Sequence, residues 1–385
     1  MTASVTILVG TTKGVFLLRS DDARSSWQTT GPHCDGWPIN HVLADPNTGT
    51  IWAAGGNEWQ GAGVWRSTDG GQTWAVSRLS TGKFDEMLAN DPGLAAYMNR
   101  SPAPPAPFTG QIDALWSLGR AGDALYAGAK PAALYASHDD GQSWAPVEGL
   151  ANHPSSDSWE PGGAGLILHS IVADSANPAK LWIGISAAGV FATEDGGTTW
   201  DRRNRLSNAD THSHDHDHGD CGHDVGHCVH NIVRAPGQGG DLMYQQNHHG
   251  VFRSPDGGRS WHDISAGLPS TFGFPIAVDP QDARRIWTLP LNGDTKGRYP
   301  PDASAAVWRS DDGGDTWQAT QNGLPTAHCF FTVLRQAMAT DHAATTGVYF
   351  GTNSGSIFAS FDHGAAWHEI ARHLPTVLSV ETLTR

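Results

Sequence analysis

Pairs of short apolar runs recur along the whole chain. One run of each pair starts with an aliphatic and an aromatic residue, as at Ile51-Trp52 and Leu181-Trp182, and the next reads like Gly-Val-Phe, as at Val190-Phe191 and Val251-Phe252. The runs are rich in β-branched and aromatic residues and are bounded by Gly, Pro, Asn and Asp, which is typical of strands separated by turns. The pattern predicts an all-β protein built from many short strands.

A motif of the form [ST]-x-D-x-G-x-[ST]-W, with some slack, follows each pair of runs. The seven copies start 47 to 70 residues apart and are 20–27, 67–74, 137–144, 193–200, 254–261, 310–317 and 360–367. A period in this range indicates a propeller or another repeat array. Each repeat then consists of four strands, A to D, with the motif as the turn between C and D.

The residue types of the motif suit a turn. Its Asp can accept backbone N–H bonds, its Gly can adopt a positive φ, and its Trp opens strand D as a large apolar plug. We therefore interpret all seven copies as structural rather than catalytic.

The two ends of the chain predict how the ring closes. Strands at 6–9 and 15–19 precede the first motif, and one further strand, 377–384, follows the last. This last strand must supply strand A of the first blade, which removes exposed sheet edges. We predict one seven-bladed β-propeller domain over residues 1–385, with blades at 376–385 plus 1–30, 38–80, 110–149, 165–204, 227–266, 272–322 and 328–372.

The motifs resemble the Asp-box, or BNR, repeats of sialidases, sortilin-type receptors and many bacterial proteins labelled as glycosyl hydrolases. The stretches QQNHHGVFRSPDGG and FGFPIAVDP are most similar to the bacterial BNR-repeat glycosyl hydrolase group. The resemblance implies a propeller, but Asp boxes occur in enzymes and non-enzymes alike. Sialidase activity is not expected, because an arginine triad is missing, Phe272-Gly273-Phe274-Pro275 lacks the arginine of the FRIP motif, and Arg298 is the only obvious anion clamp.

Charge and composition narrow the range of partners. A net charge of −15 argues against nucleic acid or an anionic membrane, so a small polar or saccharide ligand is expected. No apolar run reaches membrane-span length and the first residues lack a signal peptide, which predicts a cytoplasmic protein. Four cysteines are too few for a disulfide framework. The glycine cluster at 162–165 has no P-loop lysine, so no nucleotide cofactor is expected.

Loop lengths predict which face carries the site. The D–A and B–C loops share one face, opposite the motifs, and they include the long insertions 81–108, 150–165, 204–227 and 291–304. Long loops on a rigid scaffold are where binding usually resides. Aligning 227–234 with 328–335 and with the other A strands places one residue from each blade around the funnel: Glu381, Asn40, Asp113, His169, His230, Phe274 and Phe331.

Two chemistries fit this ring of polar groups with an apolar wall. His169 and His230, with His248, Asp113 or Glu381, could bind Zn, Ni, Cu or Fe. Alternatively, Asp113 and Glu381 could act as the acid and base of an inverting glycosidase, whose carboxyl groups lie about 6.5–9.5 Å apart. Gln246, Asn247, Trp159 and Arg298 complete the expected ligand-binding residues. A third interpretation is a binding or assembly module without catalysis.

A histidine-rich tract leads into the A strand of blade five. It carries His212, His214, His216, His218, His223, His227 and His230 with Cys221 and Cys228. Such density favours metal binding, although the spacing matches no closed zinc motif. The tract is either a feeder for a metal at His230 or a solvated loop.

Overall fold

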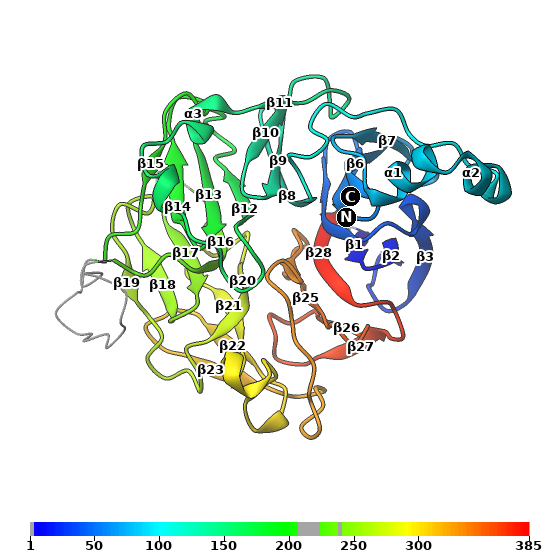
Figure 1. Cartoon of the computed structure of the whole chain (residues 1–385). Coiled ribbons are helices and arrows are strands. Elements are labelled where there is room, and N and C mark those ends of the chain that lie inside the picture. Colours follow the sequence, from blue (N-terminus) through cyan, green and yellow to red (C-terminus); the bar gives the residue numbers. More distant parts are fainter. Residues whose placement is uncertain (1–3, 207–223, 238–240, 385) are drawn as a thin grey trace.

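The computed structural model describes residues 4–206, 224–237 and 241–384 as seven four-stranded antiparallel sheets set around a central axis (Figure 1). The chain is therefore a seven-bladed β-propeller, as the repeats predicted. Strand A of each blade lies at the axis and strand D at the rim. The expected His-rich tract up to His223 lies outside the described residues.

The strand bounds follow the blades from A to D. Blades one to four contain β28 (Val377–Thr384), β1 (Val5–Thr11), β2 (Gly14–Ser20) and β3 (Trp27–His33); β4 (Ile39–Ala44), β5 (Ile51–Asn57), β6 (Gly61–Ser67) and β7 (Ala75–Arg78); β8 (Ala114–Ala121), β9 (Ala124–Lys130), β10 (Leu134–Ser137) and β11 (Ala145–Pro146); β12 (Ile167–Ala173), β13 (Leu181–Ser186), β14 (Gly189–Thr193) and β15 (Asp201–Arg202).

The remaining three blades repeat the same order of four strands. Blades five to seven contain β16 (Val229–Arg234), β17 (Met243–Asn247), β18 (Val251–Ser254) and β19 (His262–Asp263); β20 (Gly273–Val278), β21 (Ile286–Pro290), β22 (Val307–Ser310) and β23 (Gln318–Thr320); β24 (Met338–Thr340), β25 (Val348–Gly351), β26 (Ile357–Ser360) and β27 (His368–Ala371).

The last strand closes the ring. β28 pairs with β1 along its whole length, with Val380 opposite Val9, and the chain ends lie side by side in Figure 1. Val377 and Val380 are fully buried. Burial of these side chains and completion of the first sheet hold the first and last repeats together, which confirms the predicted closure.

The repeat motif forms the expected turn. In blade three, Asp139 accepts hydrogen bonds from Ser137 Oγ at 2.8 Å and from the backbone N–H of Ser143 at 2.8 Å. Gly141 has a φ of 88°, which a residue with a side chain rarely adopts. The hydroxyl of Ser143 and these other donors lower the pKa of Asp139 to about 2.

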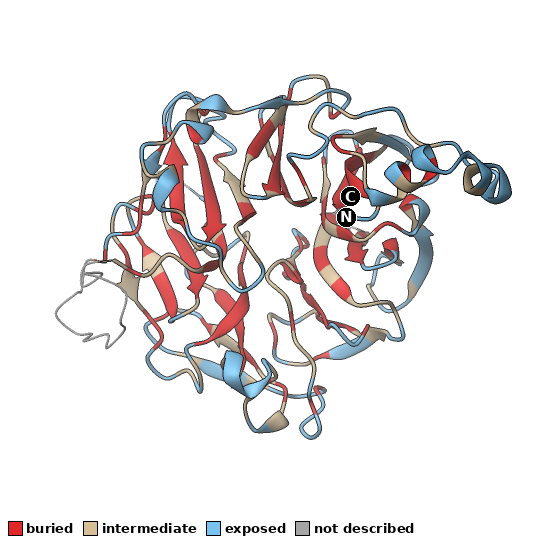
Figure 2. Ribbon diagram, in the orientation of Figure 1, coloured by how far each residue is buried: buried red, intermediate tan, exposed pale blue. Residues whose placement is uncertain are grey.

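Buried tryptophans connect three of the motifs to the preceding blade. The indole Nε1 groups of Trp52, Trp182 and Trp287, all on B strands, donate to backbone carbonyls in the motif of the following blade, at Asp140, Gly257 and His363. All three rings are almost completely buried between sheets. Figure 2 shows that most strands are buried and that the loops around the rim are exposed. One large side chain thus helps to fix the register of each of these three pairs of blades.

Helices are confined to the connections between blades. α1 (Lys83–Asn90) and α2 (Pro92–Met98) lie between blades two and three, and α3 (Glu148–Ala151) follows blade three. Among the described residues, no helix has the length and apolarity required to cross a membrane.

Candidate functional site

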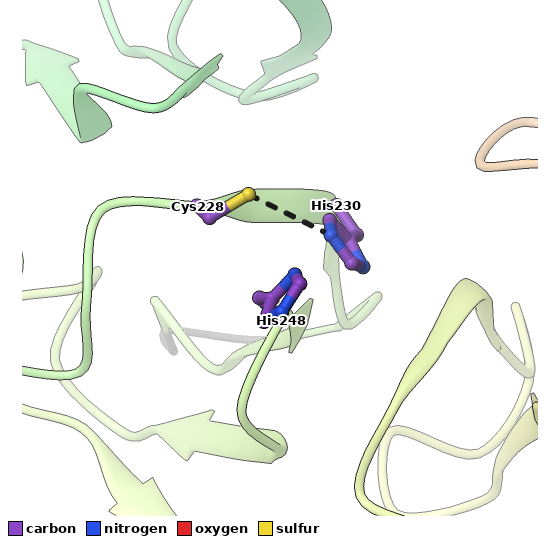
Figure 3. Close-up of side chains that lie close together, drawn as sticks. All are labelled: Cys228, His230 and His248. Atoms are coloured by element: carbon purple, nitrogen blue, oxygen red, sulfur yellow. Dashed lines mark hydrogen bonds between the residues drawn. The ribbon is translucent and has the colours of Figure 1, made fainter. Parts of the chain in front are cut away.

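Cys228, His230 and His248 lie together on the face formed by the D–A and B–C loops (Figure 3). Cys228 and His230 flank the first residue of β16, and His248 follows β17. The pairing of these two strands brings them together, since Val229 lies opposite Asn247 and His248 N–H donates to the Cys228 carbonyl at 3.0 Å. One ligand atom from each of the three residues lies within 4.8 Å of the others.

His230 is held in one orientation by a backbone acceptor. Its Nδ1 lies 2.6 Å from the Gly273 carbonyl oxygen, and its Nε2 lies 3.7 Å from Cys228 Sγ. Burial, and then the positive charge of Arg335, hold the pKa of His230 well below its usual range. The ring is therefore neutral, donates from Nδ1, and keeps a free lone pair on Nε2 that points to the thiol.

The rest of the site is part polar and part aromatic. Phe272 and Phe274 pack against His230, with ring centroids 5.2 and 4.7 Å away. On the polar side, His248 Nε2 lies 3.9 Å from a carboxylate oxygen of Asp294, in a 3₁₀ turn (Asp294–Lys296) of the B–C loop of blade six. The group therefore has an apolar wall and a neighbouring negative charge.

A β-bulge explains why His230 faces the axis. The register of β16 shifts between Val229 and Asn231, so His230 is the extra, unpaired residue. The same shift leaves Asn40 in β4 and His169 in β12 unpaired, and in β20 Phe274 and Pro275 together lie opposite one residue. Bulges re-aim a side chain at the end of a strand. For these four blades the structure places the ring residues as the sequence alignment did.

In three blades the alignment of the ring was wrong. The unpaired residue is Trp116 in β8 and Leu378 in β28, three positions away from Asp113 and Glu381. In blade seven, strand A begins only at Met338, so Phe331 lies in an irregular segment well before it. A gapless comparison of apolar patterns cannot detect an inserted residue or a missing strand.

Asp113 and Glu381 consequently lie in different cavities. Glu381 lines the central channel of about 400 Å³ and faces His41, whose Nε2 is 3.5 Å away. Asp113 lines a separate cavity of about 650 Å³ with Glu58 and Lys83, beside α1. The expected carboxylate pair is therefore not assembled.

His169 does not join the cysteine and histidine group. Its Nε2 donates to the Val229 carbonyl at 2.8 Å, and its Nδ1 lies 3.0 Å from Ser170 Oγ. Both ring nitrogens are thus engaged, and burial holds the pKa of His169 well below its usual range. Asn40 is likewise engaged, because its amide donates to the Leu115 carbonyl at 2.8 Å. These contacts connect neighbouring blades.

Several expected ligand-binding residues instead support the site. The side-chain amide of Gln246 donates to the carbonyls of Asn247, Gly250 and Thr271, and that of Asn247 donates to Gly226. These bonds hold the turn that carries His248. Trp159 packs against Phe191, with ring centroids 5.2 Å apart.

The segment before β24 crosses the channel. The carbonyl of Arg335 accepts from Asn231 of blade five at 2.8 Å, the amide of Gln336 donates to the His169 carbonyl of blade four, and Val380 N–H of blade one donates to Gln336 at 2.8 Å. Blade one lies across the ring from the neighbouring blades four and five. Arg335 and Gln336 therefore separate the candidate site from the channel that opens on the motif face.

Arg335 is the site residue that sequence reasoning missed, whereas Cys228 was expected only as one member of the histidine-rich tract. The spacing of Cys228 and His230, two residues apart on a predicted strand, is a signal that both side chains share a face. Arg335 gave no such signal, because its position depends on the irregular segment. Its guanidinium carbon lies 5.0 Å from the centre of the Phe274 ring, and that of Arg298 lies 5.7 Å from the same ring.

Comparisons with known proteins support the fold alone. No protein-family model and no curated protein matches the chain. Its structure is similar to the GH74 xyloglucanase from Xanthomonas campestris (TM-score 0.62, 17% identity, 95% of this chain and 52% of that one) and to YCF48 from Cyanidioschyzon merolae (0.53, 15%, 86% of both). It is also similar to AztD from Citrobacter koseri (0.55, 11%, 99% of this chain and 98% of that one).

The chain is shorter than the glycoside hydrolases that it matches. It spans 38% to 55% of the length of three GH74 enzymes. With identities of 14% to 17% to the GH74 and YCF48 chains, the likeness concerns the propeller and not its chemistry.

Proposed function

We propose that this propeller binds a divalent transition-metal ion through Cys228, His230 and His248 and uses it to act on a small polar substrate at the loop face. The observation that carries the proposal is the convergence of one sulfur and two imidazoles within 4.8 Å. Three protein ligands leave one position for water or substrate, which is the arrangement of catalytic rather than structural zinc sites.

The distance between the first two ligands fits such an ion. Tetrahedral zinc with ordinary Zn–S and Zn–N bonds separates the sulfur and nitrogen by about 3.6 Å, and Cys228 Sγ lies 3.7 Å from His230 Nε2. A thiolate with two imidazoles favours zinc or copper over harder ions such as Mg²⁺. The Gly273 carbonyl fixes the ring of His230 as an outer partner does in known metal sites.

The surroundings favour reaction with a bound, polarised molecule. Zinc lowers the pKa of a coordinated water to about 7 and makes it a nucleophile at neutral pH. The apolar wall of Phe272 and Phe274 limits access of bulk water on one side. Hydrolysis of a small polar compound suits this setting, and a saccharide remains one predicted ligand.

Cobalt titration tests the proposal directly. The protein is made without an affinity tag and with residues 211–217 deleted, so that the histidine tract cannot mask the site. We expect one Co²⁺ per chain and a near-ultraviolet thiolate-to-cobalt absorption band, both lost in Cys228→Ser and weakened at least tenfold in His230→Gln. His342→Gln, at an exposed histidine, serves as the control and should bind as the parent does.

Two further measurements complete the test. Zinc analysis after dialysis should give the same stoichiometry, and a panel of ester, phosphoester and glycoside substrates should show turnover only with the loaded protein. A cobalt spectrum without the thiolate band, or equal binding by Cys228→Ser and the parent, would refute the metal site. A metal site without any turnover would reduce the proposal to metal binding.

A further inference from the structure

Arg335 is only partly exposed, and no carboxylate among the described residues forms an ion pair with its guanidinium. Among the described residues its guanidinium makes no hydrogen bond or ion pair, and its Nε is buried without any partner. The guanidinium lies over the ring of Phe274, and its positive charge helps to lower the pKa of His230. Burial is strong enough to lower the pKa of Arg335 to about 10.

A guanidinium in this position is costly unless something pairs with it. Charged groups that lose part of their contact with water are normally paired, because an uncompensated charge destabilises a fold. Ordinary packing does not explain the choice of arginine, because an apolar residue would cover Phe274 equally well. The second cation over the same ring, Arg298, is already paired with Asp294, whose carboxylate oxygen lies 2.5 Å from its Nε.

Cys228 offers only part of the negative charge that would balance Arg335 and a bound metal ion. A thiolate at Cys228 would attract Arg335, but a divalent ion bound to that thiolate would leave one net positive charge on the metal group. Arg335 adds another, and the Asp294–Arg298 pair adds none. The loaded site would therefore hold two uncompensated positive charges in a partly dry environment, which favours an anion.

We infer that Arg335, assisted by Arg298, forms an oxyanion subsite beside the metal group, so that the substrate carries a carboxylate or phosphate. The planar fork of arginine matches both groups through two parallel N–H bonds. The substrate class rests on the proposed metal function, whereas anion binding by Arg335 can be measured without any metal.

Calorimetric titration with inorganic phosphate and with acetate tests the subsite. Chelator-treated protein at constant ionic strength should bind the oxyanion, and Arg335→Gln should bind it at least tenfold more weakly. Arg335→Lys keeps the charge but not the fork and should fall between the two. Arg100→Gln removes an exposed arginine near α2 and should bind as the parent does. The backbone bond from Asn231 to Arg335 does not depend on the side chain, so the crossing segment is retained.

The outcomes separate this inference from the metal proposal. Equal binding by Arg335→Gln and the parent, equal losses in Arg335→Gln and Arg100→Gln, or no binding by the parent would overturn the subsite. If Arg335→Gln does not fold, Arg335→Lys and Arg298→Gln decide by the same criterion. Cobalt binding by Arg335→Gln should persist, so losing the metal site leaves the anion result interpretable, and the reverse holds as well.

Discussion

His248 and Asp294 face each other across the boundary between blades five and six, with the imidazole Nε2 3.9 Å from a carboxylate oxygen. A carboxylate beside a ligating histidine orients the ring and raises its basicity. The same carboxylate holds Arg298, so one loop of blade six serves both parts of the candidate site.

Asp294→Asn should therefore weaken metal binding without removing a ligand. We expect a loss of about 10- to 100-fold in affinity, the usual effect of deleting an outer partner. Competition against a chromophoric chelator measures the affinity. Asp302→Asn, at an exposed position of the same loop, is the matched control. Similar affinities for Asp294→Asn and Asp302→Asn would show that the carboxylate does not support the metal.

Stability should fall as the pH drops below about 6.5, the ordinary pKa of histidine. The native fold keeps His169 neutral, because burial and then Arg335 lower its pKa well below that value, whereas the unfolded chain takes up the proton. The unfolded state thus binds more protons in this window, and stability rises with pH by up to about 1.4 kcal/mol per pH unit for each such histidine.

Urea unfolding between pH 5 and pH 8 on chelator-treated protein measures this dependence. His169→Gln should be less stable at pH 8 but should show a shallower slope, because one titrating group is removed. His342→Gln should keep the parent slope. A slope unchanged by His169→Gln would mean that other groups account for the pH dependence.

The repeat motif should contribute stability that acid removes. The pKa of Asp139 is lowered to about 2, mainly by the hydroxyl of Ser143, so its stabilisation is present above the ordinary aspartate pKa and is lost as the pH falls toward 2. Asp139→Ala should lower the unfolding free energy at pH 7 by about 1–3 kcal/mol, since several charge-assisted hydrogen bonds disappear.

Thermal unfolding at pH 7 and pH 3 tests this expectation. The difference between Asp139→Ala and the parent should shrink at the lower pH. Asp123→Ala removes an exposed aspartate from the β8–β9 turn of the same blade and should behave as the parent at both pH values. A constant difference would indicate that the carboxylate charge plays no part.

The propeller could be predicted from the sequence because the same turn-forming residue types recur in the copies of the motif. All seven copies contain an Asp acceptor and a Trp, and six contain a positive-φ glycine, because the first copy has Arg24 instead. These local requirements can be recognised in each copy by itself. The funnel residues depend on features that a pattern of apolar positions does not encode. The bulges at His230 and Trp116 insert an unpaired residue, and blade seven replaces most of strand A with the segment containing Arg335.

The metal ligands illustrate the same limit. His230 and His248 were predicted, whereas His169 was expected beside them and is instead engaged with Val229 and Ser170. Pairing of two ligands within one blade is determined by strand register, which the sequence indicates. Convergence of ligands from two blades depends on side-chain direction at the axis, and the sequence does not indicate that direction.

The segment of Arg335 and Gln336 crosses the centre of the ring, so the central channel ends at this segment. A solute that diffuses in from the motif face meets Gln336 and stops beside Glu381 and His41. A substrate of the cysteine and histidine group must enter and leave from the loop face, so a product departs by the route that its precursor took. The central channel and the candidate site can consequently hold different solutes at the same time.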